Sequence, residues 1–167
     1  MYKVREANTS DSAQICNVLR RSIIEVCGPD YNSQSVIEEW LSNKTEDNIS
    51  KWIQSESTYS VVCADENDTV VGFGLITLKG EILLIYLVPE ALYKGNGKLM
   101  LQQMEKRLSK DGVDEIHTVS SITAKAFYER NGFMQDGPPQ IVGKIEGDFP
   151  LVKKLSPYKS LNTDAPR

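Results

Sequence analysis

The stretch of residues 87–101 has the residue types and the spacing to bind an anionic group. An apolar strand ends there, a loop containing Gly95 and Gly97 follows, and an amphipathic helix begins at once. Glycines let a ligand approach the backbone closely, and the first amides of a helix have no partner within the helix. These amides favour negative charge, and Lys94 and Lys98 add positive charge. We expect this stretch to hold a pyrophosphate.

Two common nucleotide-binding motifs do not fit this stretch. The Walker A motif needs a glycine where Leu92 stands, and Ser or Thr where Leu99 stands. The dinucleotide-binding fingerprint needs a third glycine where Met100 stands. The glycine pair therefore indicates a phosphate site of another class.

The pattern around this stretch predicts a mixed sheet with helices on its faces. The expected strands are 2–6, 59–64, 69–78, 81–88, 116–119, 141–145 and 151–155, and the last two should form a closing hairpin around Gly147. The expected helices are 11–26, 33–41, 45–54, one opened by residues 95–97, and 123–130. The second, third and fourth strands have tight connections, which is typical of an antiparallel meander. The fourth is nearly all apolar and should therefore be central.

Two signals set the bounds of the first helix. Asp11 followed by Gln14 predicts a capping box at its start. Gly28, Pro29 and Asp30 predict its end.

The length of 167 residues and a hydrophobic share of 40% indicate a single domain over residues 1–155. A polar, flexible tail is expected at 156–167. The net charge of −4 argues against a nucleic-acid partner. No apolar leader follows Met1, and no run is long enough to span a membrane, so we expect a cytoplasmic protein without a membrane partner.

The cysteines do not indicate a metal site. Cys16, Cys27 and Cys63 form no CxxC pair, and His117 is the sole histidine. We therefore expect buried free thiols, a structural histidine and no metal.

Two motifs together resemble the GNAT superfamily of N-acetyltransferases. The family carries V-x-P and then Q/R-x-x-G-x-G/A, and this chain reads Leu87-Val88-Pro89 and then Leu92-Tyr93-Lys94-Gly95-Asn96-Gly97. A later family helix carries A-x-x-F-Y-x-x-x-G-F, which Ala124-Lys125-Ala126-Phe127-Tyr128-Glu129-Arg130-Asn131-Gly132-Phe133 matches in full. The resemblance implies an α+β fold of the bacterial, single-domain type. Its centre would be a mixed, mostly antiparallel, twisted sheet of about seven strands flanked by helices.

The same resemblance implies that acetyl-CoA binds here as a co-substrate. The backbone of Leu87 and Val88 would pair with the pantetheine arm and polarise the thioester oxygen. The full set of expected cofactor-binding residues is Leu87, Val88, Tyr93, Lys94, Gly95, Asn96, Gly97, Lys98, Ser121 and Phe127. Two positions depart from the family: Leu92 replaces Gln or Arg, and Ser121 replaces a frequent Asn. The phosphates should therefore rest mainly on backbone amides.

The resemblance also implies that an amine attacks the thioester directly in a ternary complex. Tyr128 is the candidate general acid for the coenzyme sulfur, and the alternative is a tyrosine of the core. Glu81 is the candidate general base if partial burial raises its pKa. The alternative is a solvated glutamate after a turn.

The acceptor pocket should lie in residues 26–52. Tyr31, Trp40 and Tyr86 are candidate substrate-binding residues, and Tyr86 is also a candidate for positioning a water. Further candidates to line the pocket or attract a cation are Cys27, Asp30, Glu38, Glu39 and Trp52. Ordinary helix packing and solvated charge are the alternative for each of them.

The leading hypothesis is therefore acetyl transfer from acetyl-CoA to a primary amine of a small molecule or peptide. The alternative is a non-catalytic acyl-CoA-binding or sensor module with the same fold. The family resemblance also allows a homodimer.

Overall fold

The computed structural model describes residues 1–142 and 145–157, with the backbone alone described at 141–142 and 145–147. The strands are β1 (Lys3–Glu6), β2 (Thr58–Ala64), β3 (Val70–Thr77), β4 (Glu81–Leu87), β5 (Glu115–Ser120), β6 (Met134–Gln135), β7 (Gln140–Val142) and β8 (Ile145–Lys154). The α-helices are α1 (Ser12–Arg21), α2 (Gly28–Tyr31), α3 (Gln34–Leu41), α4 (Glu46–Gln54), α5 (Asn96–Lys110) and α6 (Lys125–Arg130).

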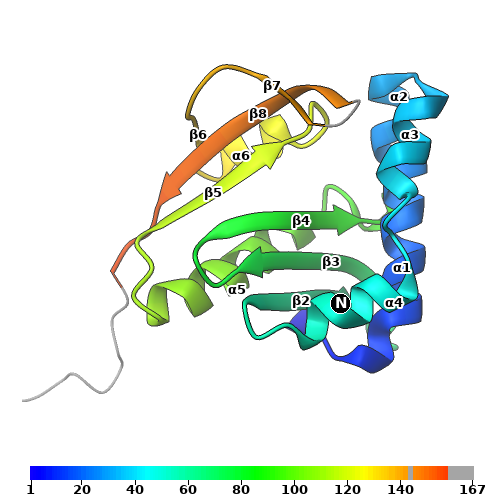
Figure 1. Ribbon diagram of the computed structural model, residues 1–167. Coiled ribbons are helices and arrows are strands. Elements are labelled where there is room, and N and C mark those ends of the chain that lie inside the picture. The colour runs from blue at the N-terminus through cyan, green and yellow to red at the C-terminus, as the bar shows by residue number, and fades with distance from the viewer. Residues whose placement is uncertain (143–144, 158–167) are drawn as a thin grey trace, which may run out of the picture.

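The strands form one mixed sheet (Figure 1). Seven strands follow the path β1-β2-β3-β4-β5-β8-β6, and β7 pairs with β8 off this path. Every pair is antiparallel except β4 with β5. The predicted mixed, mostly antiparallel sheet flanked by helices is confirmed.

The parallel pair of β4 and β5 is very short. It joins Glu81 with His117 and Ile82 with Thr118, and no pairing follows within the described strands. Figure 1 shows the two strands diverging beyond this point, so that β5 and β8 lean away from β4. We call the space between β4 and β5 beyond Ile82 and Thr118 the wedge. It separates the sheet into two halves that meet only at its closed end.

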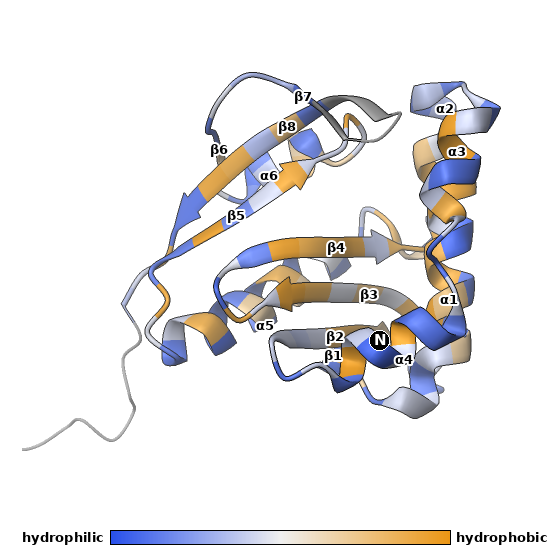
Figure 2. Cartoon of the chain, in the orientation of Figure 1, coloured by the Kyte–Doolittle hydropathy of each residue, from blue (hydrophilic) through white to orange (hydrophobic). Residues whose placement is uncertain are grey.

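Helices cover both faces of the β1–β4 half. α5 lies behind this half and packs on β2, β3 and β4, whereas α4 lies in front, on β2 (Figure 1). Glycine at position 74 lets α5 come close, since a Cβ there would lie 3.2 Å from Met104 Sδ. Figure 2 shows the middle of β4 as a hydrophobic segment, in agreement with its predicted central place in the sheet.

The first helix does not end where the sequence predicted. After α1 the chain makes a wider, π-helical turn at Ser22–Cys27 and continues as α2. Pro29 lies in the first turn of α2, where a missing N–H costs no helical hydrogen bond. The helical column ends at Asn32, which has a left-handed φ of 46°. Figure 1 shows this column beside the open end of the wedge.

The predicted capping box is also wrong. The observed box joins Asn8 and Asp11, around a short 3-10 turn at Thr9–Asp11. Gln14 is engaged elsewhere, because its Oε1 accepts the amide of Val70 at 2.9 Å. Asp11 therefore takes part in a box with the residue three positions before it, because the tertiary hydrogen bond to Val70 withdraws Gln14 from capping.

The C-terminal hairpin is longer than expected. β8 begins at Ile145, so the connection to β7 falls at 143–144, outside the described residues, and not around Gly147. β6, two residues long, was not predicted. Of the expected tail, residues 158–167 lie outside the described part, and the Ser156 carbonyl accepts Ser109 Oγ at 2.8 Å. Within the described residues, no helix has the length and apolar character to cross a membrane.

Candidate active site

The start of α5, at residues 95–98, has backbone amides that point into open space, and we call these residues the cradle. The first helical bond runs from the Leu99 amide to the Gly95 carbonyl at 3.1 Å, so the preceding amides have no acceptor within the helix. Gly95 has a φ of 80°, and a Cβ built on it would meet nothing within 4 Å. The loop therefore needs glycine for its backbone conformation, and open space lies beside it.

The second glycine of the cradle has a different function. A Cβ on Gly97 would lie 2.8 Å from Cε1 of Phe127. The ring of Phe127 therefore occupies the space beside Gly97, where a ligand was expected to approach the backbone. This contact joins the cradle to α6.

Asn96 holds the cradle in shape and leaves one atom unsatisfied. Its Nδ2 donates to the Ala91 carbonyl at 2.9 Å, and the residue is 1% exposed. Its Oδ1 has no hydrogen-bond partner among the described residues. A buried acceptor without a donor is costly, so a ligand with an N–H or O–H group fits here. The pantetheine arm of coenzyme A carries such groups.

The positive charges in and beside the cradle are unequally placed. Lys94 leans on Tyr2, with its Nζ 3.5 Å from the hydroxyl and 5.6 Å from the ring centroid. Lys98 is exposed in the first turn of α5. Tyr93 is 96% exposed and has a left-handed φ of 59°. Lys98 is thus the lysine better placed to meet an anion.

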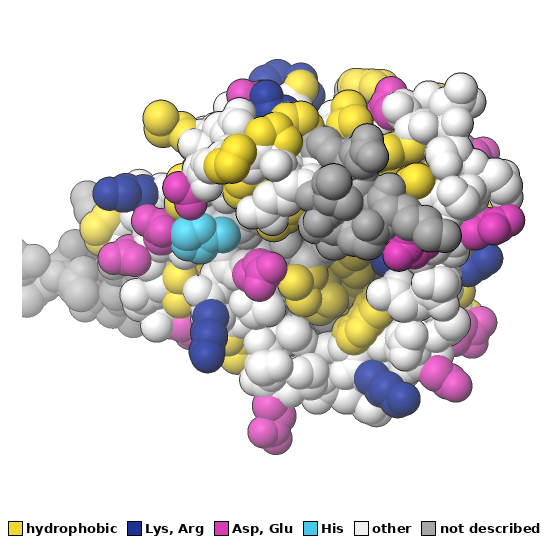
Figure 3. Space-filling view, turned by 45° about the horizontal axis from the view of Figure 1, so that its top comes forward, with side chains coloured by type: hydrophobic (Ala, Val, Ile, Leu, Met, Phe, Trp, Pro, Cys, Tyr) yellow, Lys and Arg dark blue, Asp and Glu magenta, His cyan; other side chains and the backbone are white. Residues whose placement is uncertain are grey.

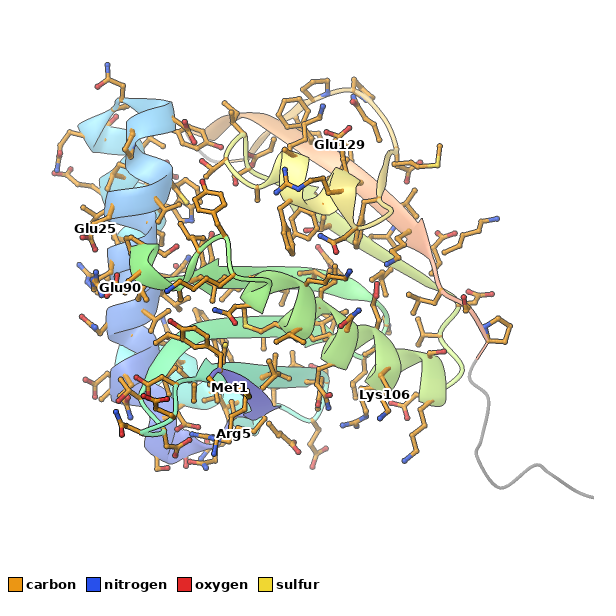
Figure 4. All side chains as sticks on the ribbon, turned by 180° about the vertical axis from the view of Figure 1, so that it is seen from behind. Met1, Arg5, Glu25, Glu90, Lys106 and Glu129 are labelled. Atoms are coloured by element: carbon orange, nitrogen blue, oxygen red, sulfur yellow. The ribbon has the colours of Figure 1, made fainter. Side chains whose placement is uncertain are left out.

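The cradle is anchored to the helical column. Arg21 of α1 binds the carboxylate of Glu90 through both terminal nitrogens, at 2.7 and 2.9 Å, and also binds Glu25 at 2.8 Å. Figure 4 shows Glu25 and Glu90 close to one another beside α1. This contact fixes the segment that links β4 to the cradle.

The free edge of β4 presents alternate backbone groups to the wedge. The Val88 amide donates to the Val71 carbonyl at 3.0 Å, so it faces β3 and is not available to a ligand. In an antiparallel ladder the next groups point the other way, which turns the amides of Leu87 and Ile85 toward the wedge. Within the Leu87–Val88 backbone that was expected to pair with the pantetheine arm, the Leu87 amide therefore faces the wedge and the Val88 amide faces β3.

Tyr128 lies beside the wedge, with its hydroxyl near those of Thr118 and Tyr86. It is 4% exposed, and its ring packs edge-on against Phe127 and Phe133, with centroids 5.2 and 5.1 Å away. Burial raises the pKa of the phenol, against a smaller opposite effect of the Thr118 hydroxyl. Thr118 itself donates to the Ile82 carbonyl at 3.2 Å, across the last pair of the parallel ladder. The phenol therefore stays protonated at neutral pH and can donate.

Ser121 belongs to the turn before α6. Its Oγ accepts the amide of Ala124 at 3.2 Å, and its carbonyl accepts Ser120 Oγ at 2.9 Å. The hydroxyl therefore positions the loop that carries α6, and its own proton remains to be donated.

A groove of about 580 Å³ lies on the front face at the closed end of the wedge. Its lining includes Glu81, His117, Val119 and Pro150. Glu81 is exposed, which differs from the partial burial expected of it as a general base. His117 pairs with Glu115 at 2.9 Å. Figure 3 shows hydrophobic side chains within a hollow on this face, near the histidine.

The structure brings the three candidate substrate-binding residues together. The Tyr31 and Trp40 rings meet edge-on with centroids 5.3 Å apart, and Trp40 and Tyr86 with centroids 6.4 Å apart. Trp40 Nε1 donates to the Tyr86 hydroxyl at 3.0 Å. Burial raises the pKa of Tyr86. Trp52, by contrast, packs on the main core, away from this aromatic cluster.

The aromatic cluster also bridges the two halves of the sheet. Thr123 donates to Asp30 at 2.6 Å, and the Ile122 amide donates to the Tyr31 hydroxyl at 3.0 Å. Both bonds join α2 to the loop between β5 and α6. The column therefore crosses the open end of the wedge on the front face.

Asp148 is the residue of this region that the sequence did not indicate. It lies on β8, is 6% exposed, and faces the Tyr31 hydroxyl. Burial raises its pKa to about 6, against a smaller opposite effect of Tyr31. Tyr31 and Asp148 are far apart in the chain, so no local pattern could have paired them. In the described part of the chain, no group of three His, Cys, Asp or Glu side chains is arranged to hold a metal ion.

Comparisons with known proteins agree with this geometry. Residues 27–148 match the family described as acetyltransferase (GNAT) domain. A spermidine N(1)-acetyltransferase of Thermoplasma acidophilum is 30% identical over 142 residues, covering 78% of this chain and 87% of the relative. The uncharacterized N-acetyltransferase YafP of Escherichia coli is 28% identical over 131 residues, covering 78% and 80%.

Solved structures show the same fold. The PaiA N-acetyltransferase of Thermoplasma acidophilum, in complex with coenzyme A, has a TM-score of 0.79 at 24% identity, covering 92% of this chain and 99% of its own. A GCN5-related N-acetyltransferase of Rhodopseudomonas palustris has a TM-score of 0.81 at 17% identity, covering 92% and 95%.

Proposed function

Because this chain belongs to the GNAT acetyltransferase family, we propose that it moves an acetyl group from acetyl-CoA to a primary amine by direct attack in a ternary complex. One observation carries the proposal: the amide cradle before α5, the free edge of β4 and the buried Tyr128 all adjoin the same wedge.

The cradle suits the diphosphate of coenzyme A, and the wedge suits its pantetheine arm. Amides before Leu99 and the side chain of Lys98 would hold the phosphates. The Leu87 and Ile85 amides would bond the arm and the thioester oxygen, where negative charge grows during attack.

The reaction needs two proton movements. The amine must lose a proton before its nitrogen lone pair attacks the thioester carbon. The carbon–sulfur bond then breaks, and the departing sulfur takes a proton from the Tyr128 hydroxyl. The raised pKa of Tyr128 keeps the phenol protonated at neutral pH, so the proton is present when the carbon–sulfur bond breaks.

The acceptor we propose is a small polycationic amine, as the name of the spermidine-acetylating relative suggests. Tyr31 and Tyr86 are half-buried and can offer ring surface to aliphatic chains and cations, while the buried Trp40 packs between them. Asp30 and Asp148 add negative charge beside Tyr31.

Release of free coenzyme A thiol tests the proposal. Wild-type protein is mixed with acetyl-CoA and a panel of spermidine, monoamines, an aminoglycoside and a lysine peptide. We expect amine-dependent thiol release, fastest with spermidine. Binding of coenzyme A without thiol release for any amine would contradict the proposed acetyltransferase activity and favour an acyl-CoA-binding module.

A further inference from the structure

Asp148 lies on β8, the strand that pairs with β5 on the side away from β4. Its neighbour Phe149 pairs with Ser120, and Pro150 pairs with Val119. Side chains alternate along a strand, so Asp148 shares the front face with Pro150, which lines the groove. Two residues of strand put Asp148 about 7 Å beyond Pro150, toward the open end.

The strand register gives the height of Asp148 along the wedge. Glu81 pairs with His117 at the closed end. The β5–β8 register ends with Ser120 opposite Phe149, so Asp148 comes one residue past that pair, four residues along from Val152, the partner of His117. Ile85 lies four residues beyond Glu81. At about 3.3 Å per residue both stand about 13 Å from the closed-end pair. Asp148 therefore stands at the height of the Ile85 amide, one strand beyond β5. Tyr31 and Trp40 connect it to Tyr86 of β4.

The surroundings of Asp148 suit a cation. The Tyr31 hydroxyl of α2 is hydrogen-bonded to it, and Asp30 and Cys27 lie near Tyr31. Lys125 lies on the other face of β8, with its Nζ 4.9 Å from the centroid of the Phe149 ring. Tyr31 is thus close to the carboxylates of both Asp30 and Asp148, and it is itself positioned by the Ile122 amide.

We propose that Asp148 binds the ammonium group of the acceptor and takes the proton that the amine must lose before it attacks. This inference rests on the proposed function. The ammonium proton passes to the Asp148 carboxylate, which leaves a neutral amine. The amine nitrogen forms the new bond to carbon, and its second proton replaces the one that Tyr128 gives to the sulfur. Asp148 then releases its proton to water, so one proton leaves per turnover.

The geometry favours Asp148 over Glu81 for this step. Glu81 is exposed and lies where β4 and β5 still pair, whereas Asp148 is buried beside the aromatic cluster. Burial also moves the pKa of Asp148 to about 6, close to the pH at which the enzyme must act as a base.

The test compares Asp148→Asn with wild type, using the panel amine that wild type acetylates fastest. In wild type, kcat/KM should rise through an acidic limb with an apparent pKa near 6. Asp148→Asn should lower kcat/KM about 100-fold, raise the KM of the amine and abolish that limb. The KM of acetyl-CoA should not change. Asp114→Asn, at the other end of β5 and exposed, is the matched control and should retain the wild-type profile.

A stability measurement separates a chemical loss from a folding defect. An ionised buried carboxylate destabilises the folded protein above its raised pKa, and protonation relieves this as the pH falls from 6 toward 4. Asp148→Asn should therefore have a higher Tm than wild type at pH 8, and the difference should shrink by pH 4.

An acidic limb that survives in Asp148→Asn and is lost in Glu81→Gln would overturn the inference. So would a kcat/KM within threefold of wild type. Absence of turnover in wild type with every amine would instead overturn the proposed function, so the two failures are distinct.

Discussion

The ring of Phe127 occupies the space in which a side chain at Gly97 would lie, because a Cβ there would come within 2.8 Å of its Cε1. The cradle and the helix that carries Tyr128 are therefore packed as one unit. Gly95 differs, since nothing lies within 4 Å of its Cβ position and its φ of 80° alone requires glycine.

The two glycines of the cradle should respond differently to the same substitution. Gly97→Ala should lower the free energy of unfolding by about 1–3 kcal/mol through overpacking, and Phe127→Leu in the same chain should recover part of this. Gly95→Ala should lower the free energy of unfolding by about 1–2 kcal/mol through backbone strain, and Phe127→Leu should not recover any of this. Urea unfolding of the four variants measures both effects. Equal recovery for the two glycines would contradict the packing argument.

Three lysines in α5 and just before it, Lys94, Lys98 and Lys106, give a graded prediction for coenzyme A affinity. Lys98→Ala should weaken binding about fivefold, and less at high salt, because an exposed lysine contributes up to about 1 kcal/mol to such a contact. Lys94→Ala should have a smaller effect, because Lys94 leans on Tyr2. Lys106→Ala, farther along α5 in Figure 4, is the control. Calorimetric titration with coenzyme A measures the dissociation constant of each variant. An equal loss of affinity in Lys106→Ala would mean that the lysines act through the overall charge of the surface and not through contact with the phosphates.

Substitution of Trp40 should change the KM of the amine and leave the KM of acetyl-CoA unchanged. Trp40→Phe keeps an aromatic ring but removes the N–H that donates to the Tyr86 hydroxyl. We expect the KM of the amine to rise about fivefold and the KM of acetyl-CoA to stay constant. Trp52→Phe, in the main core, is the control. A change confined to the KM of acetyl-CoA would place the aromatic cluster on the donor side.

Tyr128 should matter for turnover rather than for binding. Tyr128→Phe should lower kcat about 100-fold or more at saturating substrates, with the affinity for coenzyme A retained. Burial raises the pKa of the phenol above its usual value, so wild type should show no alkaline loss from this group up to pH 9. Steady-state rates from pH 6 to 9 check both points. Unchanged turnover would leave Tyr128 as a core residue only.

The sequence alone was sufficient for the fold, because the strong patterns are local. The apolar run of β4 predicted its central place, and the glycine pair marked the start of α5. The motif at residues 124–133 predicted α6, which carries Tyr128. Together with the glycine pair, this motif indicated the family.

Boundaries and long-range contacts could not be predicted in this way. Pro29 looked like a helix end, yet a proline fits the first turn of a new helix. Gln14 looked like a cap, but a tertiary partner, the Val70 amide, engages it. The bond of Val88 to β3 depends on strand register. Asp148 acquires its environment from α2, which no spacing within β8 reveals.

The central claim is that acetyl passes directly from coenzyme A to an amine in this protein. The most direct measurement follows isotope-labelled acetyl from acetyl-CoA by mass spectrometry, with and without spermidine. The account predicts labelled amide on the amine in equal amount to free thiol, and unlabelled protein when amine is absent. Label that accumulates on the protein without amine, or thiol that appears with no labelled amine, would contradict it.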